Sequence, residues 1–196
     1  MTSQADPVLE LFRSTGAYLQ GHFRLTSGLH SPEYLQCALV LAHPAYAQRL
    51  GEALAAAMQQ NFPGKIDLVA SPALGGVIIG HEVARSLGTR FLFTERDATG
   101  KMTLRRGFTV TPGETAVVVE DVVTTGGSTR EVIDLLTDAG VSVIAAGSIV
   151  DRSGGAAEVG APRVALTTLQ VQTWPPEFCP MCAAGSPVVK PGSRPV

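Results

Sequence analysis

The sequence is poor in charge, in aromatic side chains and in cysteine. Charged residues make up 16% of its 196 residues and aromatic residues 6%, and the formal net charge is −2. A chain without a basic surplus lacks the electrostatic footprint of a nucleic-acid-binding protein, so we expect no nucleic-acid partner. Hydrophobic residues nevertheless reach 45%. This composition is not typical of disorder, and the chain is long enough to bury a core.

Long apolar runs are also missing. No run approaches the roughly 18 residues that a membrane-spanning helix needs. Residues 1–7 have neither the basic start nor the apolar centre of a signal peptide. We therefore expect no membrane partner.

Cysteine is limited to Cys37, Cys179 and Cys182. An odd, unevenly spaced set is not a disulfide framework and is typical of the reducing cytoplasm, where we expect the protein to reside. Cys179 and Cys182 could supply half of a zinc site, but structural zinc normally has four ligands and no second C-x-x-C pair is present. The histidines show no metal-ligand spacing: His22, His30, His43 and His81. We therefore expect a reduced cysteine pair without a metal, and no metal-ligating residues in the chain.

Helical and extended patterns alternate along the chain. Apolar periodicity and capping residues predict helices over residues 6–15, 43–61, 77–87 and 128–139. Apolar runs predict strands over residues 67–70, 90–93, 114–120, 141–150 and 164–169. The run from Ala116 to Val119 is continuously apolar, as in a parallel strand covered on both faces. The alternation predicts an α/β fold with a mainly parallel central sheet flanked by helices.

Two stretches lack such a pattern. Residues 95–108 are polar and weakly patterned, and we interpret them as a mobile loop. Residues 173–196 are rich in proline and have no periodicity. We interpret this second stretch as an irregular tail that lies on the core or is partly disordered.

The most informative stretch follows the apolar run. Glu120 and Asp121 end the predicted strand, and residues 124–128, all threonine, glycine or serine, lead into the next helix. In parallel sheets, ligands bind beyond the carboxyl ends of the strands. Glycines let the backbone approach a phosphate, and N–H groups at a helix start donate to it. Carboxylates only accept hydrogen bonds, so the two acids favour a ligand that also carries hydroxyls. The pattern predicts a phosphorylated polyol with a vicinal diol, such as a ribose 5-phosphate.

Two other interpretations of this stretch are weaker. The loop lacks the lysine of a P-loop and the spacing of a dinucleotide fingerprint. An ordinary strand, turn and helix would explain two acids at a solvated strand end, but not the full run of hydroxyl-bearing and glycine residues that follows them.

Several segments resemble one enzyme family. Residues 119–128 resemble the 5-phosphoribosyl 1-pyrophosphate (PRPP) motif of the type I phosphoribosyltransferases. Residues 23–34 resemble the N-terminal base-binding stretch of the orotate phosphoribosyltransferases, and residues 71–76 resemble their pyrophosphate loop. Residues 150–155 resemble the segment where that family carries an arginine for the orotate carboxylate. Together the matches span about residues 8–155, in the family's order.

The resemblance implies a domain organisation and an activity. Residues 1–172 would form a type I phosphoribosyltransferase-like domain, to which residues 1–40 contribute a small base-binding hood, and residues 173–196 would be a tail. The domain would convert orotate and PRPP to orotidine 5′-monophosphate and pyrophosphate in pyrimidine synthesis, with Mg²⁺ bound mainly through PRPP. The family's active form implies a homodimer in which loop 95–108 reaches the neighbouring active site.

The resemblance also implies a role for individual residues. Asp121 and Lys101 would be catalytic. The PRPP-binding residues would be Arg96, Glu120, Asp121, Val122, Val123, Thr124, Thr125, Gly126, Gly127 and Ser128. Orotate would be bound by Thr124, Arg152, Tyr34 and Leu35, and the pyrophosphate loop would contain Ala73, Leu74 and Gly75. Arg152 suits this role because a guanidinium grips a carboxylate through two parallel bonds. The plain alternatives are a surface ion pair of Arg152 with Asp151 and a packing role for Tyr34.

Three positions depart from the family pattern. Thr26 stands where many relatives have lysine, and Gly75 replaces a basic residue that is common in the pyrophosphate loop. The usual catalytic loop with its lysines and a His-Gly pair is absent in that form. Residues 95–108 offer other cations instead: Arg96, Lys101, Arg105 and Arg106. We interpret this stretch as a pyrophosphate lid, in which Arg96 best matches the family's basic pair, although a flexible charged loop is ordinarily solvated surface.

Two other functions compete with orotate transfer. One is a phosphoribosyltransferase for another base, against which Arg152 argues because a neutral base needs no arginine for a carboxylate. The other is a PRPP-sensing regulator that binds nucleic acid. Such a regulator would need a basic face or an added domain, which the acidic sequence does not provide.

Overall fold

The computed structural model describes residues 6–25 and 27–191. Thr26, one of the departures from the family pattern, lies outside the described residues. Contacts divide the chain into two compact units, one of residues 1–40 with 170–196 and one of residues 41–169. The C-terminal tail thus shares a unit with the N-terminal segment. In the described part of the chain, no helix combines the length and the apolar character needed to cross a membrane.

The unit of residues 41–169 is built on a six-stranded sheet with the order β5-β4-β3-β6-β7-β8. Its strands are β3 (Leu68–Pro72), β4 (Arg90–Arg96), β5 (Met102–Leu104), β6 (Thr115–Val123), β7 (Ser142–Asp151) and β8 (Arg163–Thr168). All neighbouring pairs are parallel except β4 with β5. Its helices are α3 (Pro44–Asn61), α4 (Gly76–Leu87) and α5 (Gly127–Asp138). The predicted α/β architecture is therefore confirmed.

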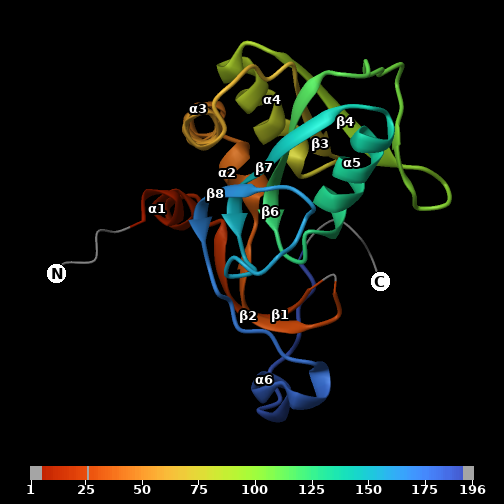
Figure 1. Cartoon of the computed structure of the whole chain (residues 1–196). Helices are drawn as coiled ribbons and strands as arrows, with labels where there is room; N and C mark the ends of the chain where they lie inside the picture. The colour runs from red at the N-terminus through yellow and green to blue at the C-terminus, as the bar shows by residue number, and fades with distance from the viewer. Residues whose placement is uncertain (1–5, 26, 192–196) are drawn as a thin grey trace. The chain divides into compact units, whose positions relative to one another are not determined.

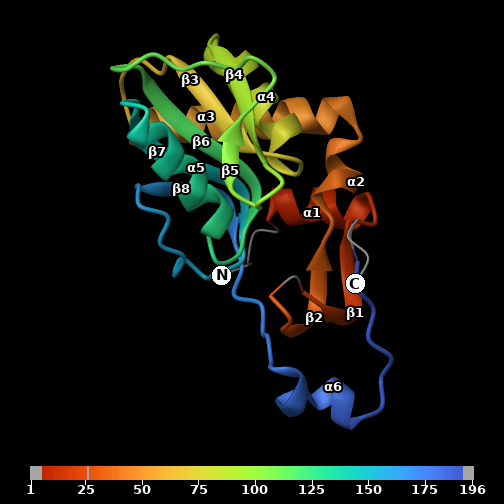
Figure 2. The same cartoon turned by 90° about the vertical axis from the view of Figure 1, so that its right-hand side faces the viewer.

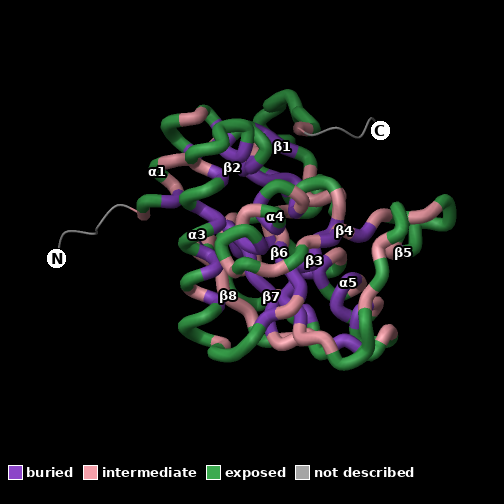
Figure 3. Tube along the Cα trace, turned by 90° about the horizontal axis from the view of Figure 1, so that it is seen from above, coloured by how far each residue is buried: buried purple, intermediate pink, exposed green. Residues whose placement is uncertain are grey.

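Helices cover both faces of this sheet. Helices α3 and α4 pack against one another on one face, and α5 lies on the other (Figures 1 and 2). The buried part of the chain is concentrated in the central strands β3, β6 and β7 (Figure 3). This double covering explains why the run from Ala116 to Val119 is apolar at every position, and all four residues are fully buried.

Strand β6 is longer than the sequence suggests. Its pairing with β7 continues past the apolar run, with Val122 opposite Val150 and Val123 opposite Asp151. The predicted end at Glu120 is therefore wrong, because β7 supplies a partner strand for three more residues. Glu120 and Asp121 consequently lie within a strand, where successive side chains point to opposite faces.

Residues 95–108 are not an unpatterned loop. Strands β4 and β5 form a hairpin in which Thr94 pairs with Leu104 and Arg96 with Met102. The turn is closed by Asp97, whose Oδ1 accepts hydrogen bonds from the backbone N–H of Thr99 at 2.8 Å and of Lys101 at 3.0 Å. Met102 is buried in the core that Leu92 and Val132 also join, and Leu104 and Phe108 pack against it. Three apolar side chains in a polar stretch anchor the segment to the sheet.

The other unit contains a two-stranded hairpin and the tail. Its elements are α1 (Pro7–Ser14), β1 (Tyr18–Arg24), β2 (His30–Leu35), α2 (Cys37–Leu41), the 3₁₀ turn η1 (Pro176–Phe178) and α6 (Pro180–Ala183). Helix α1 begins as predicted, with the Asp6 carboxylate accepting from the N–H of Val8 at 2.8 Å. The tail is more ordered than predicted, since it forms two short helical turns and pairs with the hairpin at Trp174 and Val189.

A close contact between α3 and α4 generates a stability prediction. A Cβ added at Gly51 would lie 2.5 Å from Cβ and 2.9 Å from the carbonyl carbon of Glu82. Gly51→Ala should therefore destabilise the fold by about 1–3 kcal/mol through overpacking, despite the gain of about 1 kcal/mol in helix propensity. Denaturant unfolding would measure this, with Ala56→Gly on the exposed face of α3 calibrating the propensity effect. A more stable Gly51→Ala variant would refute the close packing.

Candidate active site at the carboxyl end of the sheet

Three groups of predicted site residues converge because β3, β6 and β7 are parallel. The loop of residues 73–75 follows β3, residues 124–126 follow β6, and Arg152 follows β7. Parallel strands place their carboxyl ends on one side of the sheet, which is where ligands bind in such folds. The backbone N–H of Arg152 donates to the carbonyl of Val123 at 2.8 Å, which joins two of the three groups directly.

The loop after β6 is shaped for an anion. Gly126 has a φ of 79°, in the left-handed region, and a Cβ there would lie 2.6 Å from Cγ1 of Val159, so only glycine fits. Helix α5 begins at the next residue, and the first N–H groups of a helix have no acceptor within it. Thr124 and Thr125 are exposed and Ser128 is half-buried. Backbone donors and hydroxyls therefore gather at one helix start.

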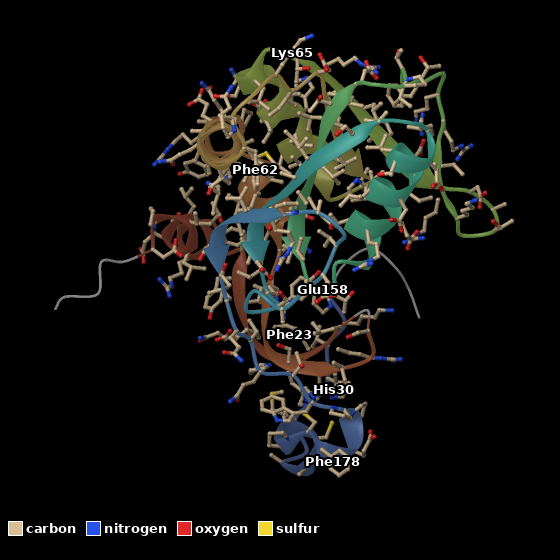
Figure 4. The ribbon with its side chains drawn as sticks, viewed as in Figure 1. Phe23, His30, Phe62, Lys65, Glu158 and Phe178 are labelled. Atoms are coloured by element: carbon tan, nitrogen blue, oxygen red, sulfur yellow. The ribbon has the colours of Figure 1, made fainter. Side chains whose placement is uncertain are left out.

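The first turn of α5 is fixed from outside the helix. The N–H of Arg130 donates to the carbonyl of Gly126 at 2.9 Å, which closes the first helical turn. The Arg130 guanidinium donates through Nε to the carbonyl of Glu158 at 3.1 Å. Glu158 lies on the connection between β7 and β8 (Figure 4). The anion-binding loop is therefore held on two sides.

Glu120 projects toward α5. The Thr129 hydroxyl donates a hydrogen bond to its carboxylate. Burial raises the pKa of Glu120 to about 7, against the Thr129 hydrogen bond that lowers it, and the neighbouring Asp121 carboxyl also raises it. Glu120 is therefore a carboxyl group poised to change its charge near neutral pH.

Asp121 projects toward the opposite face, where the loop after β3 enters α4. A Cβ added at Gly75 would lie 2.6 Å from Oδ1 of Asp121. Burial raises the pKa of Asp121, partly offset by the backbone N–H groups of Val122 and Asp121 itself. The departure at Gly75 thus has a physical reason, because a side chain at this position would have to displace the Asp121 carboxylate.

The rest of that loop is bound to the sheet. The N–H of Ala73 donates to the carbonyl of Thr94 at 2.8 Å, and the peptide bond between Ala73 and Leu74 is cis. The Leu74 side chain is 84% exposed. The loop therefore presents an exposed apolar side chain one residue before Gly75.

The cations of residues 95–108 fall into two classes. The Arg96 guanidinium makes a two-pronged ion pair with Glu131 of α5, at 2.6 and 2.9 Å, and donates to the carbonyl of Gly100 at 2.7 Å. Arg106 pairs with Glu95 at 2.7 and 2.8 Å. Lys101 and Arg105 are exposed and form no salt bridge with a described residue. Lys101 lies on the hairpin turn and Arg105 directly follows β5.

Arg152 is half-buried at the end of β7. The sequence alternative pairs it with Asp151, a carboxylate that also binds other donors. Asp151 accepts from Arg163 at 2.7 Å and from the N–H and hydroxyl of Ser153 at 2.7 and 2.6 Å. The backbone of β7 thus fixes Arg152 next to the strand end of β6.

Tyr34 and Leu35, predicted to contact the base, lie in the unit of residues 1–40 and 170–196. Both belong to β2, and the Tyr34 ring is tilted against Phe23 with centroids 5.9 Å apart. Leu35 is buried, whereas Tyr34 is half-buried. Within its own unit, Tyr34 therefore has both a packing contact and an accessible portion.

Sequence reasoning missed two residues that orient the site. Thr129 directly follows residues 124–128, so the sequence favours only one more hydroxyl donor there, and it does not single out Glu131, the partner of Arg96. Both residues lie in the first two turns of α5. An acid or a hydroxyl at the start of a helix that faces a strand end is the sequence signal by which they could have been found.

Comparisons with known proteins agree with this geometry. The family model described as phosphoribosyl transferase domain matches residues 38–180. Orotate phosphoribosyltransferase of Heliobacterium modesticaldum is 55% identical over 96% of the chain and 98% of the relative, and that of Pelotomaculum thermopropionicum is 54% identical over 96% and 97%. The crystal structure of orotate phosphoribosyltransferase from Aeropyrum pernix has a TM-score of 0.69 at 26% identity, covering 83% of this chain and 94% of that one.

The raised pKa of Glu120 predicts how stability depends on pH. In the unfolded chain Glu120 would ionise near pH 4.5, whereas in the folded protein it ionises near pH 7. Above about pH 7 the folded protein therefore carries a buried charge, which lowers its free energy of unfolding by up to about 3 kcal/mol. Glu120→Gln removes this cost. We expect the variant to be more stable than the parent at pH 8, with the difference vanishing at about pH 4.5, as measured by urea unfolding without ligands.

The matched control for this experiment is Glu158→Gln, which alters an exposed carboxyl group of the same unit. Its effect on stability should be small and nearly constant with pH. A Glu120→Gln variant whose stability tracked the parent across this range would show that Glu120 is solvated.

Proposed function

The chain belongs to the orotate phosphoribosyltransferases, within the phosphoribosyltransferase family, and on that premise we propose how its residues carry out the transfer. The reaction joins orotate to PRPP and releases orotidine 5′-monophosphate and pyrophosphate. The anomeric carbon of the ribose must lose pyrophosphate through an oxocarbenium-like state. The site must therefore bind the 5′-phosphate and the pyrophosphate of PRPP. It must also bind the ribose diol and a base that carries a carboxylate.

The observation that carries this proposal is the pairing of an anion-binding helix start with two carboxylates on one strand. Residues 124–128 would bind the 5′-phosphate through backbone N–H groups and hydroxyls. Glu120 and Asp121 would accept hydrogen bonds from the ribose hydroxyls. Anchoring the sugar at both ends fixes the anomeric carbon for attack. Negative charge from Asp121 would stabilise the developing cation.

The pyrophosphate would lie on the Asp121 side of the strand end. Residues 73–75 form the loop there, and the glycine at position 75 places no side chain against the Asp121 carboxylate. Hard carboxylate oxygens fit Mg²⁺, which keeps most of its ligands from substrate and water. Bound mainly through PRPP, Mg²⁺ would neutralise charge on the leaving group. Arg96 would exchange its ion pair with Glu131 for the pyrophosphate, and Lys101 would approach from the hairpin turn.

Arg152 would select the base. A half-buried guanidinium beside the strand end of β6 can bind the orotate carboxylate through two parallel hydrogen bonds. Thr124 would contribute from the neighbouring loop, and Tyr34 and Leu35 would contact the ring. Cys37, Cys179 and Cys182 form no disulfide with one another, which supports a reducing cytoplasm as the site of action.

The choice of base can be tested with Arg152→Ala. With PRPP and Mg²⁺ the parent should turn over orotate and not adenine, hypoxanthine or uracil. The variant should lose about 2–5 kcal/mol of orotate transition-state binding, most of it as a raised KM, if the charge pair is buried. The KM for PRPP should change little. An unchanged orotate KM would place Arg152 outside the base site, and Arg49→Ala on the exposed face of α3 controls for the loss of one positive charge from the same unit.

We further propose that two subunits share their sites. The exposed turn of residues 97–101 carries Lys101, and Arg105 follows β5, so both cations are available to a neighbouring molecule. A symmetric dimer makes such an exchange reciprocal. In this arrangement the anchored hairpin is the support and its turn is the moving part, which opens and closes on the timescale of active-site loops.

Subunit mixing tests this arrangement. Lys101→Ala with Arg105→Ala should be inactive, and so should Asp121→Asn, while both stay folded. After reassortment, about half of the dimers are mixed and each has one intact site, so activity should return to about one quarter of the parent value. Confirmed subunit exchange without recovered activity would mean that each hairpin serves its own subunit.

A further inference from the structure

Four side chains that the reaction does not use meet at the end of the β1–β2 hairpin. They are His22 of β1, His30 of β2, and Cys179 and Cys182 of the tail. All four belong to the unit of residues 1–40 and 170–196. One nitrogen or sulfur atom from each lies within 4.8 Å of those of the others. Figure 4 shows His30 between the hairpin and the tail helix, with Phe178 beyond it.

The backbone brings these residues together from three separate segments. His22 lies at a register shift of the hairpin between Gln20 and Phe23. The tail pairs with both strands: His30 and Trp174 exchange hydrogen bonds at 2.8 and 3.0 Å, and Val189 donates to the carbonyl of His22 at 2.8 Å. Between these two anchors the tail turns through α6 (Figures 1 and 2). Cys182 lies in this helix and Cys179 is its N-cap, which brings both cysteines to the histidines.

The distances match a tetrahedral site. Zinc bound to two sulfurs at about 2.3 Å and two nitrogens at about 2.0 Å has nitrogen–sulfur edges of about 3.5 Å and a nitrogen–nitrogen edge of about 3.3 Å. Nε2 of His22 lies 3.5 Å from Sγ of Cys179 and 3.7 Å from Sγ of Cys182. Nδ1 of His30 lies 3.2 Å from Sγ of Cys182 and 2.8 Å from Nε2 of His22. A shift of about half an ångström completes the tetrahedron.

A backbone carbonyl fixes the tautomer that a metal requires. Nδ1 of His22 lies 2.9 Å from the carbonyl oxygen of Ser186. A carbonyl only accepts, so Nδ1 carries the proton and Nε2 presents its lone pair to the cluster. Such a bond on the far ring nitrogen is the usual support of a metal-ligating histidine. Ser186 is itself held by the tail turn, because its N–H donates to the carbonyl of Met181 at 2.9 Å.

We propose that His22, His30, Cys179 and Cys182 bind one structural zinc ion. Two imidazoles and two thiolates in tetrahedral reach favour Zn²⁺ over oxygen-seeking cations such as Mg²⁺. Four protein ligands leave no open position for a substrate, and three of the four residues are buried. Each thiol releases its proton to solvent on binding. The ion joins the tail to the hairpin that carries Tyr34, so its role is to stabilise this unit.

The sequence expectation of an unmetallated pair rested on finding no histidine partners by spacing. The fold supplies them from residues far from the C-x-x-C pair in sequence. Cys37, the remaining cysteine, lies in α2 and is not a member of the cluster. His81 is likewise outside it, exposed on α4. These two residues provide matched controls.

Metal analysis of the full-length, untagged protein tests the site. We expect about one zinc per chain, lost in Cys179→Ser with Cys182→Ser and kept in Cys37→Ala and His81→Gln. Replacing zinc by Co²⁺ should give thiolate-to-cobalt charge-transfer absorption and the intense visible bands of tetrahedral cobalt. These signals depend on the parent protein alone, so they remain informative if the double variant does not fold.

Hydrogen exchange gives a second measurement. Removing zinc from the parent should accelerate exchange at His30, Trp174 and Val189 together, by at least about tenfold, while α5 is unchanged. Three outcomes would overturn the site. They are substoichiometric zinc after incubation with Zn²⁺ and desalting, a cobalt form without thiolate bands, or equal zinc in the folded double variant.

Discussion

The parallel pairing of β6 with β3 and β7 is the constraint on which the candidate site depends. It directs the chain so that three connections leave the sheet on the same side, and it keeps β6 extended through Val123. Because the strand does not end at the first acid, its alternation sends Glu120 toward α5 and Asp121 toward the loop before α4. In the proposed site, one strand would thereby serve both ends of the substrate, and the two carboxyl groups are buried as a result.

Much of the fold could be predicted from local patterns. The apolar run of β6 reflects a strand that helices cover on both faces, and the periodic faces of α3 and α5 reflect helices that pack on a sheet. Such patterns appear in the local sequence whatever the distant residues are. The ends of elements were less predictable, because they depend on neighbours: Val122 and Val123 stay in the strand through β7. Strand β5 has three residues, and its core contact depends on Met102 within an otherwise polar stretch. Glycine at position 75 is explained only by the carboxylate opposite it.

The residues of the candidate site also divide into those that local sequence patterns predict and those that only the fold brings together. The acids, the hydroxyl-rich loop and Arg152 are adjacent to predicted strand ends, so the sequence located them. Interactions across elements were not visible, among them the hydrogen bond of Thr129 to Glu120 and the ion pair of Arg96 with Glu131. The cluster of His22, His30 and the two tail cysteines belongs to this second class. No ligand spacing connects residues 22 and 30 to 179 and 182, and only the pairing of the tail with the hairpin does.

That pairing also affects how the molecule behaves among its copies. An isolated two-stranded ribbon has two open edges whose unpaired N–H and C=O groups can recruit strands from other chains. Here Val189 bonds β1 at His22 and Arg24, and Trp174 bonds β2 at His30, so the same tail covers part of each margin of the ribbon. Loss of the tail would expose both at once. A segment poor in regular structure thus shortens the open edge that the ribbon offers to strands of other chains.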